Sequence, residues 1–151
     1  MEYDGTKLTS ILFKSVQAGI VIVDSSTKTI MDVNPFALIM IGVPREEVVG
    51  KYCKEYLCVG KCDGCPVITA NLSDGIEEVE NKEIVLHRRD DSIVYALLTI
   101  NSAILDNRRL FINSLIDITK QKEAEMQLKS HWDYAEKLLS DNIVRLKNGV
   151  I

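Results

Sequence analysis

The sequence lacks several features that would assign it to a broad class of protein. It has no run of lysine or arginine and a net charge of -4, so it carries no electrostatic footprint for nucleic acid or membrane lipid. The longest apolar runs are far too short to cross a bilayer, and the N-terminus has no secretory signal. No phosphate-binding glycine loop, HExxH pair or Gly-x-Ser-x-Gly motif occurs. We therefore expect a cytoplasmic, non-catalytic protein that binds neither nucleic acid nor membrane.

Cysteine is absent everywhere except in one short segment, where four occur together with the spacing C-x4-C-x3-C-x2-C: Cys53, Cys58, Cys62 and Cys65. Four thiolates can hold zinc or an iron-sulfur cluster without other ligands. In a reducing compartment such a group more often binds metal or does redox work than forms stable disulfides. We therefore take the four as candidate metal ligands. Disulfides or thiols that brace the loop or respond to oxidants, and simple packing, remain as alternatives.

The length and composition predict one globular core with an appendage, since the chain has 151 residues of which 46% are apolar. Periodicity and turn residues predict an α+β fold, a five-stranded antiparallel sheet with short helices on one face and a long C-terminal helix. Asn34 before Pro35 predicts a helix start. The expected strands are 20–23, 29–33, 82–88, 92–103 and 109–118. The expected helices are 10–17, 35–40, 44–50, 67–72 and 119–147.

The last of these helices contains no glycine or proline and bears an apolar stripe that needs a partner. The stripe consists of Leu128, Ala135, Leu138 or Leu139, Asn142 and Leu146. It would either pair with a second copy as a parallel coiled coil or fold back on the sheet. Asn142 at a core-like position favours a defined two-stranded register. We expect a homodimer through this helix.

Three polar residues interrupt the apolar central strands, namely Thr99, Asn101 and Asn113. Burying such a residue without hydrogen-bond partners would cost about 1–3 kcal/mol. They should therefore face outward or line a polar pocket, and the sequence favours the outward position. Asn113 is the candidate for contact with a small-molecule ligand.

Five short motifs in a fixed order resemble those of a PAS domain with its C-terminal PAC part. The resemblance covers roughly residues 8–123, with Asp91 where glycine is usual. The motifs are AGIVIVD at 18–24, DVNPFA at 32–37, IGVPREEVVGK at 41–51, RRDDS at 88–92 and LIDITKQK at 115–122.

The resemblance implies a sensory input module with the PAS fold, whose signal passes along the helix after Thr119 to an effector such as a histidine kinase. It divides the chain into an N-terminal extension (1–8), a PAS sensory domain (9–118) and a signalling and dimerisation helix (119–151). The cue would be redox, metal or a small molecule, received through the pocket and the cysteine segment. A ligand-free interaction module with structural cysteines is the alternative. A thiol-disulfide enzyme built on Cys62 and Cys65 is disfavoured, because this CxxC lies between glycine-rich turns.

The resemblance also bears on cofactors. Cys53 occupies the place that matches the photoactive cysteine of light-sensing flavin domains, but Tyr52 and Lys54 replace the usual asparagine and arginine. Flavin is therefore disfavoured. Heme is disfavoured as well, since no histidine precedes His87 and the helix that would supply an axial ligand has none. Trp132 follows His131 where a phosphoacceptor histidine usually has an acidic neighbour, so we interpret His131 as structural.

Overall fold

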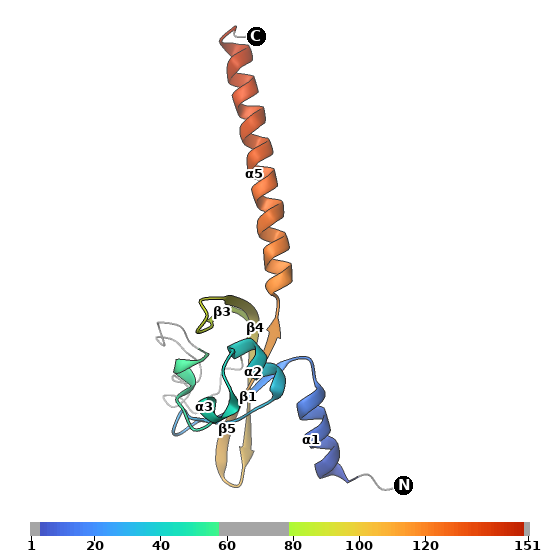
Figure 1. The fold of residues 1–151 in the computed structure, drawn as a ribbon, viewed down its shortest axis with the longest axis vertical. Coiled ribbons are helices and arrows are strands. Elements are labelled where there is room, and N and C mark those ends of the chain that lie inside the picture. The colour runs from blue at the N-terminus through green and yellow to red at the C-terminus, as the bar shows by residue number, and fades with distance from the viewer. Residues whose placement is uncertain (1–3, 58–78, 150–151) are drawn as a thin grey trace. The chain divides into compact units, whose positions relative to one another are not determined.

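The computed structural model describes residues 4–57 and 79–149, which fall into two compact units, residues 1–118 and 119–151. The second unit is the helix α5 (Thr119–Lys147). No helix in the described part of the chain has the length and apolarity needed to span a membrane. The first unit contains α1 (Gly5–Ser15), β1 (Gly19–Asp24), β2 (Ile30–Val33), α2 (Pro35–Ile41), α3 (Arg45–Val48), the 3-10 turn η1 (Cys53–Glu55), β3 (Val79–His87), β4 (Ile93–Leu105) and β5 (Arg108–Asp117) (Figure 1).

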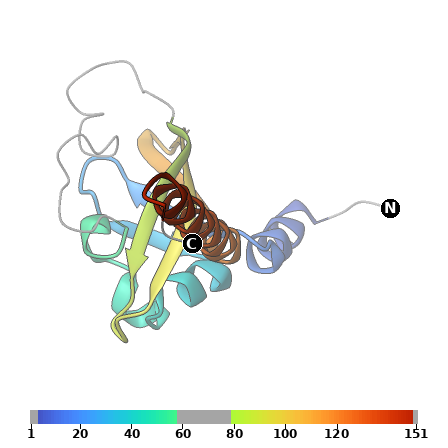
Figure 2. The same ribbon diagram turned by 90° about the horizontal axis from the view of Figure 1, so that it is seen from above.

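The five strands form one sheet in the order β2-β1-β5-β4-β3, and each neighbouring pair is antiparallel. This confirms the predicted α+β architecture with a five-stranded antiparallel sheet. Short connections join β1 to β2, β3 to β4 and β4 to β5, whereas β1 also pairs with the last strand, β5, which lies at the centre of the sheet. Strands β1 and β5, far apart in the sequence, therefore lie side by side in the sheet. Figure 2 shows the neighbouring pair β3 and β4, in yellow-green and yellow, running side by side.

The core lies between one face of this sheet and the helices that connect β2 to β3. Alternate strand residues point toward it, as expected for half-buried strands. The helices contribute Ala37, Met40 and Ile41 from α2 and Val48 from α3. The strand residues of the core cluster are Val21, Val23, Ile30, Val33, Leu86, Val94, Ala96, Leu98, Ile100, Phe111 and Leu115.

Asn34 fixes the start of α2 and ties it to the sheet. Its Oδ1 accepts hydrogen bonds from the backbone N–H groups of Ala37, at 3.0 Å, and Ile20, at 2.8 Å. Its Nδ2 donates to the carbonyl oxygen of Ala18 at 2.8 Å. Pro35 occupies the first turn, and Gly42 ends the helix with a left-handed φ of 80°. The predicted helix start at Asn34 is thus confirmed.

Two element starts differ from the sequence-based expectation by three residues or more. Helix α1 begins at Gly5, well before residue 10, because Asp4 caps it by accepting from the N–H groups of Thr6 and Lys7. Apolar periodicity alone starts too late, since the first turn of this helix is polar. Strand β3 starts at Val79, three residues before the predicted 82. The predicted helix over 67–72 lies outside the described residues.

The polar residues on the central strands divide between the two faces. Asn101 is exposed and Thr99 is half-buried, both on alternate positions from the buried residues of β4, as predicted. Asn113 is 1% exposed and lies on the inner face of β5. The outward position that the sequence favoured is therefore wrong for Asn113. Its Nδ2 donates to the carbonyl oxygen of Val21 at 3.2 Å across the β1–β5 pair, which satisfies the buried amide.

Candidate functional site

Cys53 lies in the core, at the start of η1, and its side chain is 3% exposed. Its backbone N–H donates to the carbonyl oxygen of Lys28 at 2.9 Å, and the preceding Tyr52 forms a β-bridge with Thr29. The N–H of Ile30 donates to the carbonyl oxygen of Lys51 at 2.8 Å. The entry to the cysteine segment is therefore bound to the β1–β2 hairpin. Of the four candidate metal ligands, Cys58, Cys62 and Cys65 lie outside the described residues.

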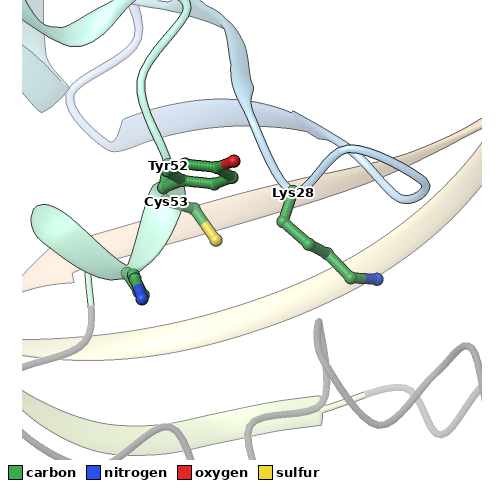
Figure 3. A pocket seen from close by; sticks show the side chains of 4 residues that line it. Lys28, Tyr52 and Cys53 are labelled. Atoms are coloured by element: carbon green, nitrogen blue, oxygen red, sulfur yellow. The ribbon is translucent and has the colours of Figure 1, made fainter.

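A cavity of about 240 Å³ opens beside Cys53 and is lined by Lys28, Tyr52, Cys53 and Lys54. Figure 3 shows the Cys53 sulfur directed into the space between η1 and the β1–β2 turn, with the Tyr52 ring above it and the Lys28 side chain extended along the other side. The parts of these side chains that face the cavity are almost entirely apolar. Such a site can accept a small apolar group.

Lys28 is held in place by the turn that carries it. Its backbone has a left-handed φ of 60°, its Nζ donates to the carbonyl oxygen of Ser25, and the same Nζ lies 5.8 Å from the centre of the Phe111 ring. The last distance is within the range of a cation–π contact. Lys28, Tyr52 and Lys54 were not singled out from the sequence as site residues. The β-bridge between Thr29 and Tyr52 that brings them together has no local sequence pattern.

Asp24 organises the same turn from its other end. Its Oδ1 accepts from Ser26 Oγ at 2.6 Å and from the backbone N–H groups of Ser26, at 2.8 Å, and Thr27, at 3.2 Å. Its Oδ2 pairs with the Arg108 guanidinium. Asp24 is 1% exposed. These donors, the Ser26 hydroxyl foremost, hold the pKa of the Asp24 carboxyl well below its ordinary value of 3.8 despite burial.

The lowered pKa of Asp24 predicts a loss of stability in acid. In the unfolded chain Asp24 takes up a proton near its ordinary pKa, whereas in the folded chain it stays ionised to lower pH. Its contribution to the free energy of unfolding is therefore complete above about pH 4 and declines as the pH falls below that value. We expect the midpoint of thermal unfolding to fall between pH 5 and 2 less steeply in Asp24→Asn than in the unchanged protein, as measured by circular dichroism at each pH. Parallel curves for the two proteins would contradict this role of Asp24.

Asn113, the residue that the sequence suggested for ligand contact, lies away from this cavity. Asn113 does not line the cavity beside Cys53. Its contact with Val21 gives the amide a structural partner, and its part in ligand binding stays a prediction.

The donor atoms that a four-cysteine metal centre would use are all cysteine sulfurs. Four thiolates in thirteen residues match the ligand set of zinc or an iron-sulfur cluster, and Cys53 is buried where a cluster would be shielded from water. Within residues 4–57 and 79–149, no group of three or more His, Cys, Asp or Glu side chains could hold a metal ion. Any centre therefore depends on the three cysteines after Cys53.

One known protein family matches most of this chain. The family model described as "PAS domain" matches residues 17–120, more than half of the sequence. The chain belongs to the PAS domain family, and it is a sensory signalling module. No curated protein matches it.

Solved structures share the fold. The PAS domain of the HTR-like protein from Haloarcula marismortui is 22% identical, with a TM-score of 0.64 over 75% of this chain and 91% of that one. The PAS domain of nitrogen regulation protein NR(II) from Vibrio parahaemolyticus is 14% identical, with a TM-score of 0.61 over 74% and 98%. An RNA-binding light-oxygen-voltage receptor is 16% identical, with a TM-score of 0.67 over 85% of this chain and 37% of that one. At these identities the likeness shows the fold alone.

Proposed function

We propose that this chain is a non-catalytic PAS input module that receives a metal or redox cue at its cysteine segment and relays it through α5 to an effector such as a histidine kinase. A metal ion or cluster would bind the thiols of Cys53, Cys58, Cys62 and Cys65, or an oxidant would oxidise them. Relay would follow because the segment is joined to the core, so that a change in it alters packing against the sheet.

The observation that carries the proposal is the burial and attachment of Cys53. A cysteine on an outer loop could be modified without effect on the fold. Cys53 instead belongs to the core, and its backbone is hydrogen-bonded to the turn that ends at Lys28. The Lys28 ammonium in turn lies over Phe111 of β5, the strand that leads through Asp117 to α5. A continuous set of contacts therefore runs from the first cysteine to the last strand of the sheet.

Metal analysis of protein purified without oxygen or chelator tests whether the cysteine segment binds a metal. We expect iron or zinc in near-stoichiometric amount, and visible absorption if the centre is an iron-sulfur cluster. Replacing Cys58, Cys62 and Cys65 by serine should abolish the metal while leaving Cys53 in the core, so far-ultraviolet circular dichroism serves as the control for folding. The absence of both iron and zinc from the unchanged protein would contradict the metal cue. If the thiols were then also insensitive to peroxide, the redox cue would be contradicted as well.

A small-molecule cue is a second candidate, favoured by the cavity between Lys28, Tyr52, Cys53 and Lys54. Its occupant would be a small acid whose apolar body contacts the apolar lining and whose carboxylate extends outward to the exposed Lys54 ammonium. A thermal-shift screen of aliphatic and aromatic carboxylates should find compounds that stabilise the protein. Lys54→Glu should remove this stabilisation. Lys51→Glu should not, because Lys51 is also exposed but does not line the cavity. Equal loss in both variants would contradict binding in this cavity.

The module is proposed to act as a homodimer through α5. The helix would hold two copies together, and the cue would favour one of two arrangements of the pair. An interaction module without any cue remains the rival, and it predicts that serine at all four cysteines leaves dimerisation unchanged under every redox and metal condition.

A further inference from the structure

Lys28 has a backbone conformation that its residue type rarely adopts. In the described part of the chain, the non-glycine residues with a positive φ are Lys28, Asn81, Asp91, Asp106 and Asn107. Asparagine and aspartate tolerate this region because their short side chains can hydrogen-bond to nearby backbone, whereas lysine has no such advantage. A φ of 60° at Lys28 therefore has a conformational cost that the surrounding contacts must offset. This makes the contacts of Lys28 a candidate for a functional role.

Three parts of Lys28 contact three different parts of the first unit. Its carbonyl oxygen accepts a hydrogen bond from the N–H of Cys53 at 2.9 Å, so its backbone is joined to the cysteine segment. The aliphatic part of its side chain lines the cavity beside Cys53, across from the sulfur in Figure 3. Its ammonium donates to the carbonyl oxygen of Ser25 and lies 5.8 Å from the centre of the Phe111 ring. One residue therefore contacts the cysteine segment, the cavity and β5.

The first residues of the same turn are fixed to β5. The N–H of Ser25 donates to the carbonyl oxygen of Arg109 at 3.0 Å, and the Asp24 carboxylate pairs with Arg108. The N–H of Lys28 donates to the carbonyl oxygen of Asp24 at 2.9 Å, which closes the turn. The turn is therefore anchored on β5 at its first residues and joined to the cysteine segment at Lys28.

We infer that Lys28 is the positioning residue through which both candidate cues, at the cysteine segment and in the cavity, act on β5. A shift of Cys53 would move the Lys28 carbonyl, and an occupant of the cavity would displace the Lys28 side chain. Either movement changes the position of the ammonium over the Phe111 ring. Phe111 is 1% exposed and pairs with Val23 of β1, so it responds by a change in core packing. The inference rests on the proposed function and adds the residue that joins its site to the sheet.

The contact between Lys28 and Phe111 depends on the charge of the ammonium. The face of an aromatic ring attracts a cation, so arginine can replace lysine there, whereas methionine cannot. Methionine is a flexible apolar side chain that can still line the cavity. Lys28→Met therefore removes the contacts of the ammonium, and Lys28→Arg is the conservative control. Both variants keep a long side chain at the same positive φ.

Amide hydrogen exchange of the reduced, metal-free chain tests Lys28 without any cue. Because coupling is reciprocal, loosening the ammonium from β5 should also loosen the hydrogen bond between Cys53 and Lys28. In Lys28→Met we expect the N–H of Cys53 to exchange about twofold to fivefold faster. The N–H of Asn34, which donates to Ile20 at the other end of the β1–β2 pair, should exchange as before. Lys28→Arg should leave both rates unchanged.

Three results of this exchange experiment would overturn the inference. One is an unchanged rate at Cys53 in Lys28→Met, which would mean that the ammonium does not hold the turn. Another is equal acceleration at Asn34, which would indicate a general loss of stability. The third is an acceleration by Lys28→Arg as large as that by Lys28→Met, since the charge would then play no part.

The ring signals of Phe111 in nuclear magnetic resonance show whether Lys28 transmits a cue. The chain has three phenylalanines, so selective labelling gives few signals, and Phe111→Leu assigns those of Phe111. We expect zinc, added to the reduced protein without oxygen, to shift these signals in the unchanged protein and in Lys28→Arg. The shift in Lys28→Met should be no more than about half as large. A full shift in Lys28→Met would overturn the inference.

The two experiments separate the role of Lys28 from the proposed function. Failure of zinc to bind the unchanged protein would contradict the metal cue, whereas the exchange rate at Cys53 would still decide whether Lys28 joins the cysteine segment to β5. Zinc binding together with an unchanged exchange rate in Lys28→Met would support the metal cue and overturn the inference.

Discussion

Replacing Asn34 by alanine is expected to lower the free energy of unfolding by about 3 kcal/mol. The Asn34 side chain is fully buried and makes three hydrogen bonds, which reach Ala18, Ile20 and Ala37. Alanine would leave two N–H groups and one carbonyl without these partners in a site closed to water. The cost exceeds that of an ordinary helix cap because the same amide also joins α2 to the start of β1. Urea unfolding followed by circular dichroism measures it.

Asn101→Ala is the matched control, since it makes the same chemical change on an exposed position of β4. Its effect should lie within about 0.5 kcal/mol of zero. Asn34→Asp keeps the acceptor for the two N–H groups but loses the donor to Ala18, so it should fall between the two. Equal stability of Asn34→Ala and Asn101→Ala would contradict the account of α2.

Replacing Gly19 by valine is expected to cost about 3 kcal/mol for the opposite reason, overpacking. A Cβ at Gly19 would lie 3.0 Å from Met40 Sδ, 3.2 Å from Ala37 Cα and 3.2 Å from Leu115 Cβ. Met40 can move, but the backbone of α2 and the neighbouring strand cannot yield without disturbing the core. Glycine at this position therefore allows α2 to lie directly against β1. The same unfolding measurement applies.

Gly5→Val provides the control for Gly19→Val, because no atom lies within 4 Å of a Cβ at Gly5. Its effect should stay below about 1 kcal/mol, the range of helix propensity. A larger loss at Gly5 than at Gly19 would mean that backbone preference, and not the close approach of α2, governs both positions.

The fold follows from the sequence where local chemistry acts alone. The β-branched run before Asp24, the Asn34–Pro35 pair and the glycine at position 42 gave the strand, the helix start and the helix end. Helix α5 followed from the absence of glycine and proline. The start of α1 was missed because Asp4 acts through backbone hydrogen bonds and leaves no apolar pattern. Conformation at Asp91, with a φ of 65°, shows that an aspartate can hold a turn where the family usually has glycine.

The candidate site was predictable only in part. The cysteine spacing drew attention to Cys53 but could not show that its side chain is buried. The cavity lining combines residues from the turn at Lys28 and from 52–54, which meet through the Thr29–Tyr52 bridge, a contact between segments more than twenty residues apart. Asn113 was identified as polar on a central strand, yet its inward direction depends on the register of β5 against β1. A one-residue change in that register would have placed it outside.

The central claim is that the state of the cysteine segment alters the pairing of α5, and one comparison tests it most directly. Sedimentation equilibrium gives the dimer dissociation constant of the full chain purified anaerobically, and then of the same protein after its thiols have been stripped of metal by a chelator or oxidised by peroxide. The account predicts a change of about fivefold or more, equivalent to about 1 kcal/mol. It predicts no change in the variant with serine at Cys58, Cys62 and Cys65. One dissociation constant shared by all states of the unchanged protein would contradict the relay.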